Sequence, residues 1–147
     1  MKLKQITISL ENRHGRLYEV TRALGDLGIN IRALNHVDTG AFGQLRMLVS
    51  DVVSARRLLM EKHLPARIEE VVAVEIEDRP GSLADMLEIL YPTDINAVYS
   101  YAFVGMSGRN AIMIFCFNDN DRAIELLRKH NIKILTAKDF DIVESST

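Results

Sequence analysis

The chain has 147 residues, of which 48% are apolar and 26% charged, a composition that excludes disordered and collagen-like proteins. Its 18 Lys+Arg stand against 20 Asp+Glu, so there is no surplus of positive charge to attract nucleic acids or anionic membranes. No apolar run reaches the ~20 residues of a membrane span, and residues 1–7 lack the apolar core of a signal peptide, so we expect a cytoplasmic protein.

In the first half of the chain the hydrophobic period switches between strand and helix. Ile6, Ile8 and Leu10 alternate with polar residues, which predicts a half-buried strand. After Gly15, apolar residues recur every three or four positions, which predicts an amphipathic helix that ends at Gly28. The elements expected next are a hairpin of strands at 29–37 and 44–50, a helix near Val53–Lys62 and a last strand.

The second half repeats this order. Its first strand, Val71–Ile76, follows Pro65 after five residues without Gly, Ser or Pro. The last strand of the first half therefore runs almost directly into it, and we expect the halves to be rigidly related. The elements expected next are a helix from Leu83 to Leu90 that ends at Pro92, a hairpin of strands at 95–104 and 111–117, a helix near Asp121–His130 and a last strand.

This order reflects an internal repeat in the sequence. Residues 11–17 (ENRHGRL) recur as residues 77–83 (EDRPGSL), a spacing of 66. Two further matches are Ile29-Asn30 with Ile95-Asn96 at the same spacing, and Ala55–Leu59 with Ala123–Leu127 at a spacing of 68. We expect the two additional residues in the turn Gly105–Gly108, and we predict a duplicated fold with domains at 1–69 and 70–147.

The predicted fold class is α+β: two tandem ferredoxin-like βαββαβ units, each an antiparallel sheet with both helices on one face. A unit of ~70 residues buries only ~60% of the surface of its unfolded chain. We therefore expect the two units to share an interface.

The two strand-to-helix turns are the candidate binding sites. Gly15 and Gly81 begin the helices, where free N–H groups and the helix dipole favour an anion. Asn12 offers an amide that can donate to a carboxylate and accept from an ammonium, the two groups of a free amino acid. Asn30 and Asn96 offer similar amides after the helices. The competing interpretation of these residues is structural, as turn formers and helix caps.

Two motifs carry a resemblance to a known family. Asp78-Arg79-Pro80-Gly81-Ser82-Leu83 after a strand, together with Gly28-Ile29-Asn30-Ile31 after a helix, resembles the ACT domain, a small regulatory module that binds amino acids in many enzymes of amino-acid metabolism. The resemblance covers essentially the whole chain, as two ACT domains in tandem. It implies an effector that lies between neighbouring ACT domains, held by the turn of one and the start of the second strand of the other.

The resemblance also implies ligand-binding residues. Asn12 is similar to the turn amide of serine-binding members, whereas Asp78 stands at that place in the second copy and would repel the ligand's carboxylate. We therefore favour a site that joins Asn12 with Asn96 over the opposite pairing. The histidine that serine-binding members carry two residues earlier is replaced by Leu10 and Ile76, which leaves the effector's identity open. The candidate residues are Asn12, Gly15, Asn30, Asp78, Gly81 and Asn96.

Catalysis is not expected from this sequence. Cys116 is the one cysteine, which excludes an internal disulfide and a thiolate zinc cage. An acylphosphatase shares the topology, but the glycine-bounded phosphate loop that it needs is missing around Arg13 and Arg79. We predict no catalytic residue, no metal and no cofactor.

Two further interpretations concern partners. Tyr99, Tyr101 and Phe103 alternate and could form an RNA-stacking face, but no Lys or Arg set flanks them, so packing in an interface is favoured. The predicted function is a non-catalytic sensor of a free amino acid that forms a homodimer. The alternative is a regulatory subunit that docks on a separate amino-acid biosynthetic enzyme.

Overall fold

The structure is a computed structural model that describes residues 1–104 and 110–145. The expected turn at Gly105–Gly108 lies outside the described residues. The elements in chain order are β1 (Leu3–Glu11), α1 (Arg16–Asp26), β2 (Ile31–Asp38), β3 (Phe42–Val49), α2 (Val52–Glu61), β4 (Ala66–Glu77), α3 (Ser82–Leu90), β5 (Ala97–Val104), β6 (Asn110–Phe117), α4 (Asn120–Lys129), β7 (Lys133–Leu135) and a 3-10 helix η1 (Ala137–Phe140).

The chain forms two compact units. The first unit contains Lys4–Glu69 and the chain from Ala137 onward, and the second unit contains Met1–Leu3 and Glu70–Thr136. The chain changes unit between Glu69 and Glu70, inside β4, and also between Leu3 and Lys4 and between Thr136 and Ala137. Residues Met1–Leu3 belong to the second unit, and the chain from Ala137 onward belongs to the first. The two repeat copies therefore do not coincide with the two compact units. The domain boundaries 1–69 and 70–147 remain a prediction.

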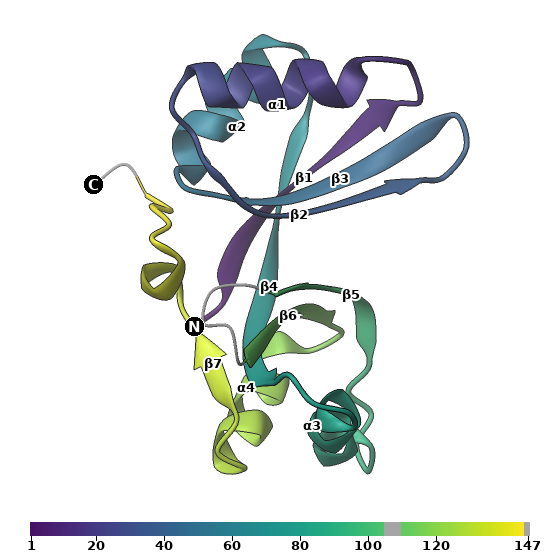
Figure 1. The fold of residues 1–147 in the computed structure, drawn as a ribbon, viewed down its shortest axis with the longest axis vertical. Coiled ribbons are helices and arrows are strands. Elements are labelled where there is room, and N and C mark those ends of the chain that lie inside the picture. The colour runs from purple at the N-terminus through teal and green to yellow at the C-terminus, as the bar shows by residue number, and fades with distance from the viewer. Residues whose placement is uncertain (105–109, 146–147) are drawn as a thin grey trace. The chain divides into compact units, whose positions relative to one another are not determined.

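In the first unit the strands follow the order β2-β3-β1-β4. β1 and β2 each pair antiparallel with β3, with Ile8 opposite Leu45 and Leu34 opposite Met47. Figure 1 shows α1 and α2 together on one face of this sheet. Their buried residues include Val20 and Leu59, which supply the apolar face of the core.

Strand β1 differs from the half-buried strand predicted for it. Ile6, Ile8 and Leu10 are buried as expected, but Gln5 and Thr7 on the opposite face are buried as well. Gln5 Nε2 donates to Thr7 Oγ1 at 3.0 Å, so each of these buried polar side chains has a hydrogen-bond partner. β1 is therefore a strand buried on both faces over residues 5–8.

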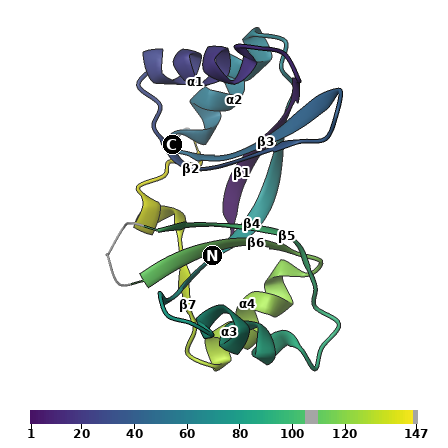
Figure 2. The same cartoon turned by 45° about the vertical axis from the view of Figure 1, so that its right-hand side comes forward.

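In the second unit β4 lies between β7 and β6, and β5 pairs with β6. Figure 2 shows α3 and α4 on the same face of these strands. The strands and the two helices enclose one cluster of buried side chains, which comprises Val72, Val74, Met86, Leu90, Ile95, Met113, Phe115, Phe117, Ala123, Ile124, Leu127 and Ile134. The α+β class with two ferredoxin-like units is confirmed.

The junction of the two copies is one continuous strand. We expected a last strand of the first copy followed by a first strand of the second, but β4 runs unbroken over Ala66–Glu77. No Gly or Pro interrupts residues 66–70, so nothing ends the extended conformation there. The chain therefore passes from one unit to the other within a hydrogen-bonded strand.

The C-terminal segment packs in the first unit. After η1, Val143 donates its backbone N–H to Ser50 O at 2.8 Å and accepts from Val52 N at 2.9 Å. These bonds tie the segment to the start of α2. None of the helices in the described residues is long and apolar enough to cross a membrane.

Candidate functional site

The two strand-to-helix turns have the same backbone. Gly15 and Gly81 adopt left-handed conformations with φ of 84° and 85°, which only glycine adopts without a steric penalty. The carbonyl of each glycine accepts the N–H four residues on, from Glu19 or Asp85, at 2.9 Å. No side chain caps either helix. The first N–H of each helix, of Arg16 or Ser82, donates to the carbonyl of Arg13 or Arg79 at 3.2 Å. The next two N–H groups of each helix have no such partner in the described chain and are therefore available to a ligand.

A hollow of about 270 Å³ lies at the turn of the first unit, and we call it the first-turn hollow. Its volume falls just below the ~300–1,000 Å³ that is usual for ligand pockets, so it suits a small ligand. The β1–α1 turn and the β2–β3 hairpin both contribute to it. The lining residues are Leu10, Glu11, Asn12, Arg13, His14, Gly15, Arg16, Leu17, Tyr18, His36, Asp38 and Gly43.

The amide of Asn12 is held by the hairpin. Its Nδ2 donates to Asp38 Oδ2 at 3.1 Å and to Gly40 O at 3.2 Å. Both partners are acceptors, so the orientation of the amide is fixed, and both of its donor hydrogens are used. We expected Asn12 to donate to a carboxylate as well as to accept from an ammonium. In this conformation it offers Oδ1 alone, and that oxygen has no donor among the described residues.

Charged side chains surround the first-turn hollow. Arg16 pairs with Glu19 at 3.1 Å, and Arg13 lies 3.7 Å from Glu11 and 3.9 Å from Glu19. Arg16 Nε is buried and has no hydrogen-bond partner within the described chain. The two guanidinium groups and the two carboxylates of this cluster therefore have no net charge beside the helix start.

Sequence reasoning missed the hairpin side of the hollow. His36, Asp38 and Gly43 line it but were not among the candidate residues. A Cβ on Gly43 would lie 3.2 Å from His36 Nε2 and 3.0 Å from Val37 O, so glycine is needed to let the histidine ring lie over β3. The signal available in the sequence was a glycine near the start of a strand, which often marks a close approach.

The turn of the second unit has different side chains. A hollow of about 430 Å³ lies beside it, bordered by Arg79, Ser82 and Asp85, whereas Asp78 and Gly81 do not line it. Arg79 is held between Glu77 at 2.7 Å and Asp85 at 3.1 Å, and hydrogen bonds to these carboxylates raise its pKa. The first unit has at this place the amide of Asn12, which is hydrogen-bonded to the hairpin, whereas the second unit has the exposed carboxylate of Asp78.

Asn30 and Asn96 occupy equivalent positions at the other ends of the helices. The backbone N–H of Asn30 donates to Ser50 Oγ at 2.8 Å, and its carbonyl accepts from Ser50 N at 2.8 Å. In the same way, Asn96 N donates to Asn118 Oδ1 at 2.9 Å, and its carbonyl accepts from Asn118 N at 3.0 Å. Both asparagine residues are exposed, and Asn96 borders a separate hollow of about 320 Å³.

The length of the helix separates the two kinds of amide within one unit. α1 has 11 residues and is therefore ~16 Å long, with Asn12 before its start and Asn30 after its end. One small ligand cannot contact both. A site that uses both kinds of amide needs two domains, and the pairing of Asn12 with Asn96 remains a prediction.

Two other kinds of site, a metal site and an aromatic surface for stacking bases, find no support in the described residues. Within residues 1–104 and 110–145, no group of three or more His, Cys, Asp or Glu residues is arranged to hold a metal ion. In the aromatic row, Tyr101 is buried and Tyr99 is half-buried, so neither presents an open ring face. The side chain of Phe103 lies outside the described part.

Two tandem βαββαβ units, each with an uncapped helix that begins at a left-handed glycine, define a regulatory fold of the ACT type. Residues 1–143 match the family described as an ACT domain pair, and the chain belongs to that family. ACT domains are regulatory modules, so the family membership places this chain among regulatory proteins.

Solved structures show the same fold. Protein BT0572 from Bacteroides thetaiotaomicron is 34% identical with a TM-score of 0.91, over 97% of this chain and 98% of that chain. The ligand-free regulatory subunit of aspartate kinase from Thermus thermophilus is 16% identical with a TM-score of 0.60, over 86% and 91% of the two chains, which shows a shared fold. No curated protein matches this chain.

Proposed function

We propose that this chain is a non-catalytic sensor that binds a free amino acid at the first-turn hollow, within an interface between ACT domains. One observation carries the proposal. Leu17 and Tyr18, whose backbone N–H groups have no partner among the described residues, line the same small hollow as Asn12, whose Oδ1 is an unused acceptor. A free amino acid carries a carboxylate and an ammonium on one carbon. The N–H donors complement the carboxylate, and the Oδ1 acceptor complements the ammonium.

Each group of the ligand has a defined partner in this proposal. The carboxylate accepts N–H bonds from the first turn of α1, where the helix dipole favours a negative charge. The ammonium donates to Asn12 Oδ1, and the carboxylate of Asp38 in the same hollow adds a favourable charge. Asn96 of a second ACT domain supplies the second amide. So few contacts give a Kd between micromolar and millimolar, about −8 to −4 kcal/mol.

The side chains of the turns favour the first unit over the second. In the second unit Asp78 replaces the amide, and its exposed carboxylate has no hydrogen bond or ion pair with any described residue. A carboxylate at that place repels the carboxylate of an amino acid. We therefore propose that the amino acid binds at Asn12 and Gly15, and that Asp78 and Gly81 bind no ligand.

A thermal-shift screen tests this function. Each of the twenty amino acids is added at millimolar concentration, and a ligand at 100 times its Kd adds about 2.7 kcal/mol to the free energy of unfolding. We expect one amino acid, or a small related group, to stabilise the parent protein but not Asn12→Ala. Asp78→Ala, at the equivalent place, is the matched control and retains the response. A response that survives Asn12→Ala would refute the assigned site.

A second candidate function is a regulatory subunit that docks on a separate amino-acid biosynthetic enzyme. Its support is the exposure of large apolar side chains on the helices, including Tyr18 and Met60, which is typical of surfaces that bind proteins. The solved relative with a TM-score of 0.60 is itself a regulatory subunit of aspartate kinase. This function is preferred if no amino acid stabilises the protein while purification of the tagged chain recovers such an enzyme at constant stoichiometry.

A further inference from the structure

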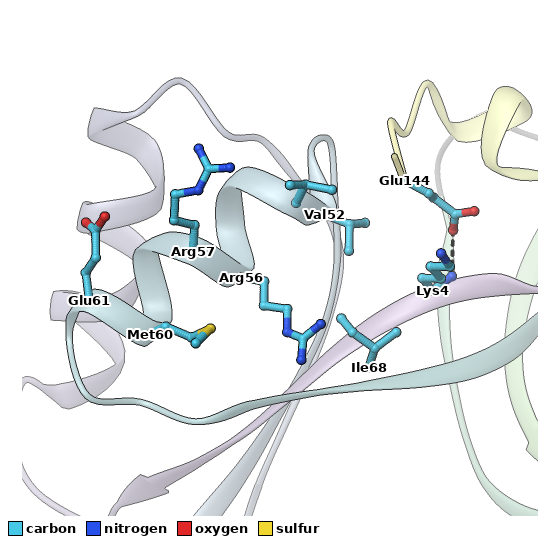
Figure 3. Close-up of a pocket in the computed structure, with 9 residues that line it drawn as sticks. Lys4, Val52, Arg56, Arg57, Met60, Glu61, Ile68 and Glu144 are labelled. Atoms are coloured by element: carbon cyan, nitrogen blue, oxygen red, sulfur yellow. Dashed lines mark hydrogen bonds between the residues drawn. The ribbon is translucent and has the colours of Figure 1, made fainter. Parts of the chain in front are cut away.

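A groove beside α2 in the first unit is not used by the amino-acid site. It has a volume of about 750 Å³ and lies between α2, the start of β4 and the C-terminal segment. Figure 3 shows Arg56 extending from α2 toward Ile68 of β4. We call it the α2 groove, and its lining residues are Lys4, Val52, Val53, Arg56, Arg57, Met60, Glu61, Ile68 and Glu144.

The α2 groove combines apolar surface with a free cation. Val52, Met60 and Ile68 give it an apolar lining, and Met60 is 61% exposed. The Arg56 guanidinium is exposed and has no hydrogen bond or ion pair anywhere in the described chain. Such a groove fits an apolar surface that carries a carboxylate.

A surface of that kind is present on α3 of the second unit. Leu83, Leu87 and Tyr91 follow one another at intervals of four residues, so they form one stripe along the helix, which we call the α3 stripe. They are 37%, 36% and 88% exposed. Glu88 flanks the stripe, and no residue that the structure describes pairs with its carboxylate.

Neither surface is duplicated, although the fold is. At the spacing of 66, Leu83 corresponds to Leu17, but Leu87, Glu88 and Tyr91 correspond to Thr21, Arg22 and Gly25, so the apolar stripe is not repeated. At the spacing of 68, Arg56 corresponds to Ile124, which is buried, and Met60 to Arg128. The fold therefore does not require these side chains, and each copy has one exposed apolar patch that the other lacks.

We propose that the α2 groove binds the α3 stripe of a second copy of this chain. Leu87 and Tyr91 cover the apolar lining, and Arg56 pairs with Glu88, so that two free charges of opposite sign neutralise each other. In a closed two-fold dimer the contact occurs twice, once with each chain as the donor of the stripe. Tyr91 and Arg56 are of the residue types that dominate the binding energy of interfaces. Leu87 and Tyr91 also line the hollow that Asn96 borders, but the contact between groove and stripe needs no bound amino acid.

A charge exchange tests the pairing, with sedimentation equilibrium as the measurement. We expect the parent protein to form a dimer, and we expect Arg56→Glu and Glu88→Arg each to raise its Kd by at least about tenfold. The double variant, in which the charges are exchanged, returns to within about threefold of the parent. Arg128→Glu, a charge reversal at another exposed arginine, on α4, is the control and leaves the Kd unchanged. A monomeric parent, an unchanged Kd in the single variants or no recovery in the double variant would overturn the proposal.

Cross-linking checks the partners of the contact independently of charge. Two chains are prepared in a Cys116→Ser background, one with Met60→Cys and one with Leu87→Cys. A short bismaleimide should join the two chains when they are mixed, at a much higher yield than either chain with itself. A higher yield for Leu87→Cys alone would show that two α3 stripes meet each other, which would overturn the proposal.

Discussion

The two strand-to-helix turns share a backbone but differ in chemistry. Gly15 and Gly81 have φ values within one degree of each other, and each glycine carbonyl accepts the backbone N–H of the residue four positions later. At the first turn Asn12 is latched to the β2–β3 hairpin and presents an acceptor, whereas at the second Asp78 presents a charge. The comparison teaches that the fold supplies the donors at both helix starts. In the proposed function, Asn12 together with the hairpin residues that hold it makes the first turn the binding site.

The largest expected effect comes from giving the first turn the residue of the second. Asn12→Asp removes the donor to Asp38 and places two carboxylates where an N–H···O bond of 3.1 Å existed. We expect the affinity for the amino acid to fall about 100-fold or more, measured by calorimetric titration. The reverse change, Asp78→Asn, leaves the affinity and the stoichiometry as they were. A second site created by Asp78→Asn would show that the turns differ by this side chain alone.

The left-handed glycines give the next effect. Gly15→Ala and Gly81→Ala each force an L residue to a positive φ, at a cost of about 1–2 kcal/mol in the free energy of unfolding, measured with urea. Gly25, also in the first unit, has ordinary backbone angles and open space around its Cβ position. Gly25→Ala is therefore the matched control, and we expect it to stabilise by up to about 1 kcal/mol. Equal effects at Gly15 and Gly25 would contradict the strained turn.

The N-caps of α2 and α4 give a smaller effect that depends on pH. Asp51 accepts from Ser54 N at 3.0 Å and from Ser54 Oγ at 2.8 Å, whereas Asp119 accepts from Arg122 N at 3.1 Å. Asp51→Ala should cost about 1 kcal/mol, and Asp119→Ala somewhat less.

The sign of the pH dependence follows from the cap of α2. The N–H of Ser54, followed by its hydroxyl, lowers the pKa of Asp51 in the folded state. Its contribution is therefore complete above the unfolded pKa of about 3.9 and is lost as the pH falls through the folded value. Urea unfolding at pH 7 and pH 3 measures it: the difference between parent and Asp51→Ala should shrink at pH 3. A difference that grows on acidification would contradict the cap.

The smallest effect is expected at Arg79. Its ion pairs with Glu77 and Asp85 are exposed to solvent and screened by salt, so Arg79→Gln should change the unfolding midpoint little. A large loss of stability, undiminished in 1 M NaCl, would show that these pairs hold the second turn together.

The sequence predicted the local structure well, because that structure depends on neighbouring residues. Glycine before an apolar period of three or four marked α1 and α3, and alternation marked the strands. The latch between Asn12 and Asp38 could not be predicted, since it joins residues that are 26 positions apart through hairpin geometry. The placement of the C-terminal segment beside α2 rests on backbone bonds of Val143, which leave no pattern in sequence.

The most direct measurement of the central claim is a two-dimensional amide NMR titration with the amino acid found in the thermal screen. If the carboxylate binds the first turn of α1, the amide signals of Arg16, Leu17 and Tyr18 shift with a common Kd, together with the side-chain amide of Asn12. The equivalent amides after Gly81, from Ser82 onward, stay in place. Shifts confined to the residues after Gly81, or saturation without any change at Arg16–Tyr18, would contradict the account.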